Sequence, residues 1–342
     1  MVAAISVDSS LSLQIGRTCH RVITEEIEGL IKVYKDGYVE RSHIVASVAP
    51  KLASELGVMS QDVVIDKFTN VWARFYVPSS CHGNNNPNNL PLMIYFHGGG
   101  FCVGSASWIC YHEFLARLAS KANCLIMSVN YRLAPENPLP AAFEDGIKAL
   151  MWLRKQGLSE EYYWWSKKCN FSKIFVAGDS AGANIAYNII TRLSSSNGVL
   201  DMKPLTIKGL ILIQPFFGGE VRTNSEKYLV QSTRSALTLA SSDTYWRLAL
   251  PRDANRNHPW CNPQVGVKME KLMDLEIMVF ISEMDILKDR NLEFVNGLCK
   301  AGKKVEHVVH KGVGHAFQVL SKSQISQTRA IEMISQIKSF IN

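Results

Sequence analysis

The sequence predicts an α/β fold, with a mostly parallel β-sheet flanked by helices and an antiparallel hairpin at one edge. From about Asp62 onward, short β-rich runs alternate with longer helical patterns, as in a helix-covered parallel sheet. The runs LMIYF and LILI are almost continuously apolar, which is typical of central strands buried on both faces. With 342 residues, 47% of them hydrophobic, the chain can bury one large core.

The expected elements follow this alternation in chain order. The runs DVVIDKF and VWARFYV are expected to form the edge hairpin. The β-rich character of the later runs predicts parallel strands at 92–96, 124–130, 173–178, 207–214, 276–282 and 304–310. Between them, helical patterns predict helices near 107–120, 141–156, 181–194, 290–301 and 325–341.

Three regions interrupt the alternation. Residues 79–91 are rich in Asn and Pro and are expected to form a solvated loop. Residues 1–60 precede the alternating pattern and contain the amphipathic segment EEIEGLIKVY, and residues 216–262 lack strand patterns but contain the helical segment LASSDTYWRLAL. No linker divides the chain, so a single domain is expected. We expect residues 1–60 and 216–262 to pack together as a lid on this domain.

Composition argues against several classes of partner. The net charge of +7 comes from 37 basic and 30 acidic residues scattered along the chain, which does not favour a nucleic-acid-binding protein. No apolar run approaches the roughly 18 residues of a membrane span, and the N-terminus lacks the basic region of a secretory signal. The eight cysteines have no CxxC or metal-type spacing, so reduced thiols, no metal and a cytosolic or nuclear location are expected.

The segment GDSAG at 178–182 is a candidate nucleophile turn. It fits the pattern G-x-S-x-G between a predicted strand and a predicted helix, where small flanking residues allow a strained turn that exposes the Ser180 hydroxyl. A serine present only because a small residue fits a tight turn would give the same GDSAG segment. The functional interpretation therefore depends on finding the other groups that acyl transfer requires.

A serine nucleophile needs a base, and the base needs a carboxylate that orients it. Four histidines follow Ser180, and we favour His315 because it lies in the Gly-rich loop KGVGHAF between the last strand and the last helix. The alternatives are His258 in a lid-like loop, and His307 and His310 within a strand pattern.

The carboxylate is expected just after the preceding strand. Asp285 is preferred, because it follows FIS at the turn into the next helix. One residue of register would select Glu283 instead, whereas Asp289 is expected to cap the helix.

Acyl transfer also needs preorganised donors for an oxyanion. The segment HGGG at 97–100 follows a buried strand, so the N–H groups of Gly98, Gly99 and Gly100 can approach a substrate without obstruction by side chains. With the N–H of Ala181 at the start of the next helix, they form the predicted oxyanion hole.

These motifs together resemble a known family. The segments HGGG, YRLAPE at 131–136, GDSAG, the late Asp285 and GHAF around His315 are similar to the hormone-sensitive-lipase group of α/β-hydrolases. More narrowly, IKVYKDGYVER at 31–41 and FFGGEVRTNSE at 216–226 resemble the plant carboxylesterases, the group that also contains the gibberellin receptors. The resemblance covers about residue 25 to the C-terminus and implies an α/β-hydrolase fold with an N-terminal cap and the triad Ser180, Asp285 and His315.

The expected activity is cofactor-free hydrolysis of a small, largely apolar carboxylic ester through an acyl-enzyme, with a strigolactone as one conceivable substrate. Two alternatives remain open: a hormone receptor with a vestigial site, or an enzyme of the same fold that cyclises or eliminates. The relatives that act as gibberellin receptors lack the histidine and the dehydratases replace the serine, whereas this sequence keeps both. Candidates for the apolar pocket are the aromatic residues Phe101, Trp108, Phe216, Phe217, Tyr245 and Trp246.

Overall fold

The computed structural model describes residues 21–50, 56–79, 89–159, 163–195, 201–231, 235–265 and 269–342. Most of the expected 79–91 loop, and the first twenty residues of the expected lid, lie outside these ranges. Eight strands form the main sheet in the spatial order β11-β10-β9-β8-β6-β7-β5-β4. Their bounds are β4 (Val58–Asp66), β5 (Val71–Pro78), β6 (Leu90–Phe96), β7 (Leu125–Asn130), β8 (Cys169–Asp179), β9 (Ile207–Ile213), β10 (Glu276–Ser282) and β11 (Val305–His310).

Strand pairing matches the predicted mixture of parallel and antiparallel pairs. The hairpin β4–β5 is antiparallel and lies at one edge, and β5 pairs antiparallel with β7. All pairs from β7 to β11 are parallel. The carboxyl ends of β6, β8, β9, β10 and β11 therefore point to the same edge of the sheet, where ligand sites of open α/β sheets are built.

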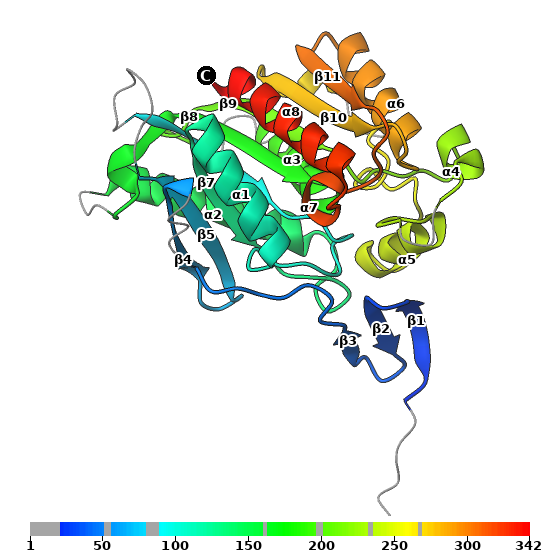
Figure 1. Ribbon diagram of the computed structural model, residues 1–342. Coiled ribbons are helices and arrows are strands. Elements are labelled where there is room, and N and C mark those ends of the chain that lie inside the picture. The colour runs from blue at the N-terminus through cyan, green and yellow to red at the C-terminus, as the bar shows by residue number, and fades with distance from the viewer. Residues whose placement is uncertain are drawn as a thin grey trace, which may run out of the picture.

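Helices cover both faces of the sheet. The principal ones are α1 (Ile109–Ala122), α2 (Ala141–Leu158), α3 (Ala181–Ser195), α6 (Lys288–Lys300) and α8 (Gln324–Ile341). Buried residues of α1 and α8 belong to one hydrophobic cluster, and those of α2, α3 and α6 belong to another, so the two sets lie on opposite faces. Figure 1 shows α1 and α8 in front of the sheet, with α2 and α3 behind it.

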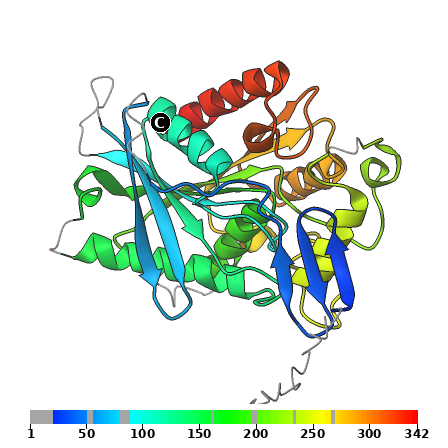
Figure 2. The ribbon, with the colours of Figure 1, turned by 60° about the horizontal axis from the view of Figure 1, so that its bottom comes forward.

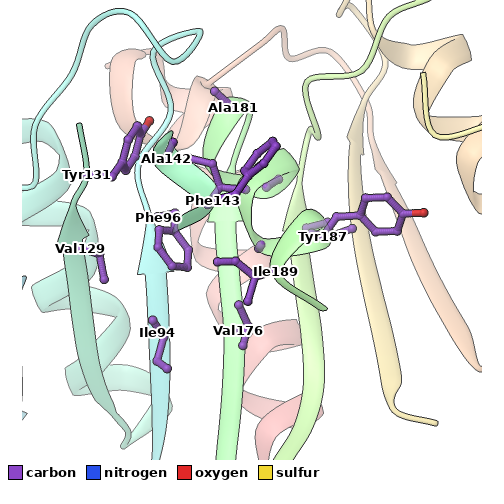
Figure 3. Packing of buried hydrophobic residues seen from close by; sticks show 14 of the residues in the cluster. Ile94, Phe96, Val129, Tyr131, Ala142, Phe143, Val176, Ala181, Tyr187 and Ile189 are labelled. Atoms are coloured by element: carbon purple, nitrogen blue, oxygen red, sulfur yellow. The ribbon is translucent and has the colours of Figure 1, made fainter. Parts of the chain in front are cut away.

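The alternation of side chains along β6 explains why both faces are apolar. Ile94 and Phe96 pack in the cluster with α2 and α3, whereas Met93 and Tyr95 pack in the cluster with α1 and α8. Figure 3 shows Phe96 in this region with Phe143 of α2 and Ile189 of α3. The expected burial of the central strands on both faces is confirmed.

Two further segments lie near the carboxyl edge of the sheet. The strands β1 (Ile23–Ile27), β2 (Ile31–Tyr34) and β3 (Val39–Arg41) form a small antiparallel sheet, so EEIEGLIKVY spans two strands and their turn. The 216–262 segment contains α4 (Asn224–Tyr228) and α5 (Leu239–Ala249), and no strand among its described residues. Figure 2 shows the small sheet beside α5, and an Arg247–Glu25 pair with N–O distances of 2.9 Å joins them.

The remaining elements are short: the helix α7 (Phe317–Leu320) and the 3-10 turns at Ser166–Lys168 and Met269–Lys271. In the parts of the chain that the structure describes, no helix combines the length and the apolar character needed to cross a membrane.

Candidate active site

Ser180 lies in a tight turn between β8 and α3. Its φ of 52° is in the left-handed region, which side-chain-bearing residues rarely adopt. The flanking glycines allow this turn, because a Cβ atom on Gly182 would lie 1.9 Å from the carbonyl oxygen of Phe96 and one on Gly178 would lie 2.4 Å from the carbonyl carbon of Gly182. The turn has the geometry that a G-x-S-x-G nucleophile requires.

Ser180, His315 and Asp285 form a hydrogen-bonded chain. Nε2 of His315 lies 2.8 Å from Oγ of Ser180, and Nδ1 of His315 lies 2.6 Å from Oδ2 of Asp285. Because the ionised carboxylate can only accept, Nδ1–H donates to it and Nε2 is left to accept the serine proton. Asp285 is further fixed by the N–H of Leu287, which donates to its Oδ1 at 3.0 Å.

The alternative acid candidates make other contacts. Glu283 accepts a hydrogen bond from the N–H of Gly312 on the exposed side of the loop. Asp289 lies in the first turn of α6, where the helix dipole favours a carboxylate, but it does not cap the helix, because the N-cap position is Leu287. Its carboxylate accepts from the N–H of Ser225 in the 216–262 segment. Of the three carboxylates, Asp285 is therefore the one that contacts the histidine.

The alternative histidines also lie away from Ser180. His310 is buried between Phe280 and Phe317, and His307 is exposed on β11. His258 packs against Trp260.

The protonation of His315 is set by its burial and by Asp285. Burial lowers the pKa of His315, but the charge of Asp285 and its hydrogen bond outweigh burial, so the net pKa lies above the usual 6.5. Asp179 adds a smaller contribution in the same direction.

We therefore predict an acidic limb in the pH dependence of kcat/KM, with a midpoint above pH 6.5. His315 must be neutral to accept the serine proton, and its neutral fraction grows as the pH rises through its pKa. Initial rates on a short ester between about pH 5 and pH 9 measure this midpoint. A rate that stays constant down to about pH 5 would contradict the assignment of His315 as the base.

The glycine loop after β6 supplies backbone donors beside Ser180. Gly99 and Gly100 line the same cavity as Ser180, and their φ angles of 111° and 58° favour glycine. A Cβ atom on Gly100 would lie 2.3 Å from Cγ of the Tyr245 ring. Among the described residues, none accepts a hydrogen bond from the N–H of Gly99, Gly100 or Ala181, so these three groups are available to an oxyanion.

Gly98 differs from the sequence expectation. Its N–H donates to Oη of Tyr111 at 2.8 Å and to Oδ1 of Asp179 at 3.0 Å. A Cβ atom there would lie 2.8 Å from the other oxygen of Asp179. Gly98 therefore anchors the loop instead of contributing an oxyanion donor, and the predicted hole reduces to Gly99, Gly100 and Ala181.

Asp179 is a supporting residue that the sequence interpretation did not single out. It is 1% exposed and also accepts hydrogen bonds from the hydroxyls of Tyr95 and Tyr111. Burial raises the pKa of Asp179 to about 6, although these hydrogen bonds oppose the rise. The signal available in the sequence was an acidic residue inside the nucleophile turn, where a buried carboxylate needs fixed donors.

A cavity of about 240 Å³ opens beside the triad. Of the six aromatic candidates, Trp108, Phe216 and Tyr245 line this cavity. Its other lining residues include aliphatic side chains from both segments outside the α/β alternation and from α7, namely Leu30, Ile44, Leu237 and Leu320.

The remaining three aromatic candidates belong to the core, so their assignment to the pocket is wrong. Trp246 stacks on Phe216 at 4.6 Å between ring centroids, and Phe101 packs against Trp246. Phe217 packs against Phe294 of α6. Phe101 and Trp246 therefore pack behind Phe216, which forms part of the cavity wall.

Comparison with known proteins agrees with this geometry. A family model described as the alpha/beta hydrolase fold matches residues 93–319. The Probable carboxylesterase 6 of Arabidopsis thaliana is 53% identical over 94% of this chain and 93% of its own length. The 3-O-acetylpapaveroxine carboxylesterase CXE1 of Papaver somniferum is 36% identical over 78% of this chain and 84% of its own. The gibberellin receptor GID1A of Arabidopsis thaliana is 34% identical over 84% of this chain and 81% of its own length.

Solved structures give the same result. An esterase from Pyrobaculum calidifontis superposes with a TM-score of 0.67 at 26% identity, covering 82% of this chain and 85% of its own. The metagenomic carboxylesterase EstE1 superposes with a TM-score of 0.69 at 25% identity, covering 86% of this chain and 92% of its own.

The predicted fold and the predicted enzyme class, a carboxylic ester hydrolase, are confirmed. The chain belongs to the α/β-hydrolase family, in the group that contains the plant carboxylesterases.

Proposed function

We propose that this protein hydrolyses small, largely apolar carboxylic esters through an acyl-enzyme on Ser180. The observation that carries the proposal is the chain of hydrogen bonds from Ser180 through His315 to Asp285, at 2.8 and 2.6 Å. Nε2 of His315 takes the hydroxyl proton as Oγ attacks the ester carbonyl, and Asp285 stabilises the resulting imidazolium. The alcohol then leaves with that proton, and water releases the acid by the same steps in reverse order.

The oxyanion of the tetrahedral intermediate is held by the N–H groups of Gly99, Gly100 and Ala181. Their freedom from other described acceptors supports this role, since donors that are already engaged would have to break a bond first. The hydrogen bonds of Gly98 to Asp179 and Tyr111 hold the loop in place, so little reorganisation is needed during the reaction.

The cavity supports the substrate class. A volume of about 240 Å³ is small for an enzyme pocket, and its walls are formed largely by aliphatic and aromatic side chains. Such a site favours an ester with a short or compact apolar acyl group. A strigolactone is the natural ester class that we propose to test after simple substrates.

We also propose that residues 1–60 and 216–262 act as the lid. Support comes from the shared cavity walls, to which Leu30 and Ile44 contribute from the first segment and Leu237 and Tyr245 from the second. The Arg247–Glu25 pair joins the two segments. Both segments must be in place for the pocket to be closed to water.

The proposed reaction is tested by following the hydrolysis of p-nitrophenyl butyrate by the wild-type protein in ¹⁸O-labelled water. We expect steady turnover, one ¹⁸O atom from water in the released acid, and covalent labelling of the Ser180 peptide by an organophosphate. Turnover of a natural ester without ¹⁸O incorporation would indicate cyclisation or elimination instead. Binding of a ligand without turnover or labelling would favour the receptor alternative.

A further inference from the structure

Gln214 is a buried polar residue directly after β9, and both polar groups of its side chain form hydrogen bonds. Nε2 donates to Oγ of Ser282 at 2.7 Å, and Oε1 accepts from the N–H of Ala316 at 2.7 Å. The residue is 0% exposed and has a φ of 47°, a left-handed conformation that costs energy for any residue with a Cβ atom. A fully buried amide with two side-chain hydrogen bonds and a strained backbone is expected to have a specific structural role.

The two residues linked by Gln214 come from the acid strand and from the base loop. Ser282 is the last residue of β10, three positions before Asp285. Ala316 directly follows His315 and precedes α7. The Gln214 side chain therefore bridges the two loops that carry the acid and the base.

The main chain around Gln214 holds the nucleophile turn. The carbonyl of Ile213 accepts from the N–H of Ser180 at 2.8 Å, and the N–H of Phe216 donates to the carbonyl of Ser180 at 3.0 Å. In addition, the N–H of Gln214 itself donates to the carbonyl of Phe280 on β10 at 2.8 Å. Segment 213–216 is thus connected to all three loops of the triad.

The loop that carries His315 is held at its two ends. Near its start, the carbonyl of Val313 accepts from the N–H of Met284 at 3.0 Å. At its end, Ala316 adopts a left-handed conformation with a φ of 56°, which is unfavourable for alanine. The hydrogen bond from its N–H to Gln214 opposes relaxation of that conformation, which would move the adjoining His315.

We propose that Gln214 is a positioning residue for the base, fixing His315 between Asp285 and Ser180 through its bonds to Ala316 and Ser282. The inference rests on the proposed function, in which His315 takes the serine proton. Gln214 does not line the cavity, so its effect should fall on the chemical step and leave substrate binding largely unchanged.

The test is Gln214→Leu, which keeps approximate size and removes both hydrogen bonds. We expect kcat on a short ester to fall by about 10- to 100-fold, because a small displacement of a catalytic group has a cost of this order. KM should stay within about twofold of the wild-type value. The midpoint of the acidic limb should move to lower pH, since a displaced His315 loses part of its interaction with Asp285.

Ser282→Ala distinguishes the contributions of the two hydrogen bonds of the Gln214 side chain. It removes the acceptor for Nε2 but keeps the bond from Ala316 to Oε1, so we expect a smaller loss of kcat than in Gln214→Leu. The double variant should be no slower than Gln214→Leu alone, because both changes act on one bridge. Asn188→Leu is the control for loss of a buried amide, since the partner of its Nδ2 among the described residues is Asn184, within the same helix α3.

A second measurement does not depend on turnover. The proton between Nδ1 of His315 and Asp285 should give a downfield ¹H NMR resonance, which we expect to shift or broaden in Gln214→Leu but not in Asn188→Leu. Wild-type values of kcat, limb midpoint and resonance in Gln214→Leu, or equal changes in Asn188→Leu, would overturn the positioning role. A wild-type protein that is inert to esters would instead overturn the proposed function, and the resonance would still decide the role of Gln214.

Discussion

Ser180→Ala is expected to abolish ester hydrolysis, lowering kcat by roughly 10⁴- to 10⁶-fold. The variant removes the one oxygen that lies 2.8 Å from Nε2 of His315 and changes little else. Alanine carries a Cβ atom as serine does, so the strain of the left-handed turn at φ 52° is retained. The loss of rate should therefore report the hydroxyl group alone.

Ser128→Ala is a matched control for this prediction. Ser128 is also buried, but it lies within β7, and no described residue forms a hydrogen bond with its hydroxyl. We expect near-normal turnover from this control and similar unfolding temperatures for both variants. Retention of more than about a tenth of the wild-type kcat by Ser180→Ala would mean that hydrolysis does not proceed through this serine.

The parts of the site that could be predicted from the sequence are those whose geometry is local. The turn at Ser180 requires glycines within two residues on either side, because β6, β8 and α3 approach within contact there. His315 lies in a short Gly-containing loop after a strand, so its place at the carboxyl edge of the sheet follows from strand order. Local spacing and the alternation of strands and helices were sufficient for these residues.

Other features depend on contacts between distant segments. Three glycines in a row could all have supplied oxyanion donors, and Gly98 is removed from that set by Tyr111 and by Asp179, which lies 81 residues later. The cavity wall is likewise formed by segments that meet across 222 residues, as the Arg247–Glu25 pair illustrates. Aromatic character alone could not separate Tyr245, which lines the cavity, from Trp246, which packs behind it.

Gln214 is a further residue whose role could not be predicted from the sequence. In the sequence it is one polar residue at the end of an apolar strand, a position where solvent exposure would be the ordinary expectation. Its role emerges only when the ends of β9 and β10 and the residue after His315 are placed side by side.

Asp285→Asn is the second change for which we expect a very large effect, a fall in kcat on the order of 10⁴-fold. The Oδ1 atom of the asparagine can still accept from the N–H of Leu287, so the side chain should keep its orientation. Its amide N–H₂ then faces Nδ1 of His315 in place of the Oδ2 atom. Because two donors cannot bond to each other, Nδ1 becomes the acceptor and the proton moves to Nε2, which can no longer take the proton of Ser180.

Glu283→Gln is the matched control, and it decides the one-residue ambiguity in the sequence. Among the described residues, the carboxylate of Glu283 accepts from the N–H of Gly312, and glutamine can preserve that bond, so kcat should stay within about threefold of wild type. Steady-state kinetics of both variants on one ester, with the pH dependence of each, gives the comparison. The midpoint of the acidic limb should fall only in Asp285→Asn, since the charge of Asp285 raises the pKa of His315. A larger loss in Glu283→Gln than in Asp285→Asn would reassign the orienting carboxylate to Glu283.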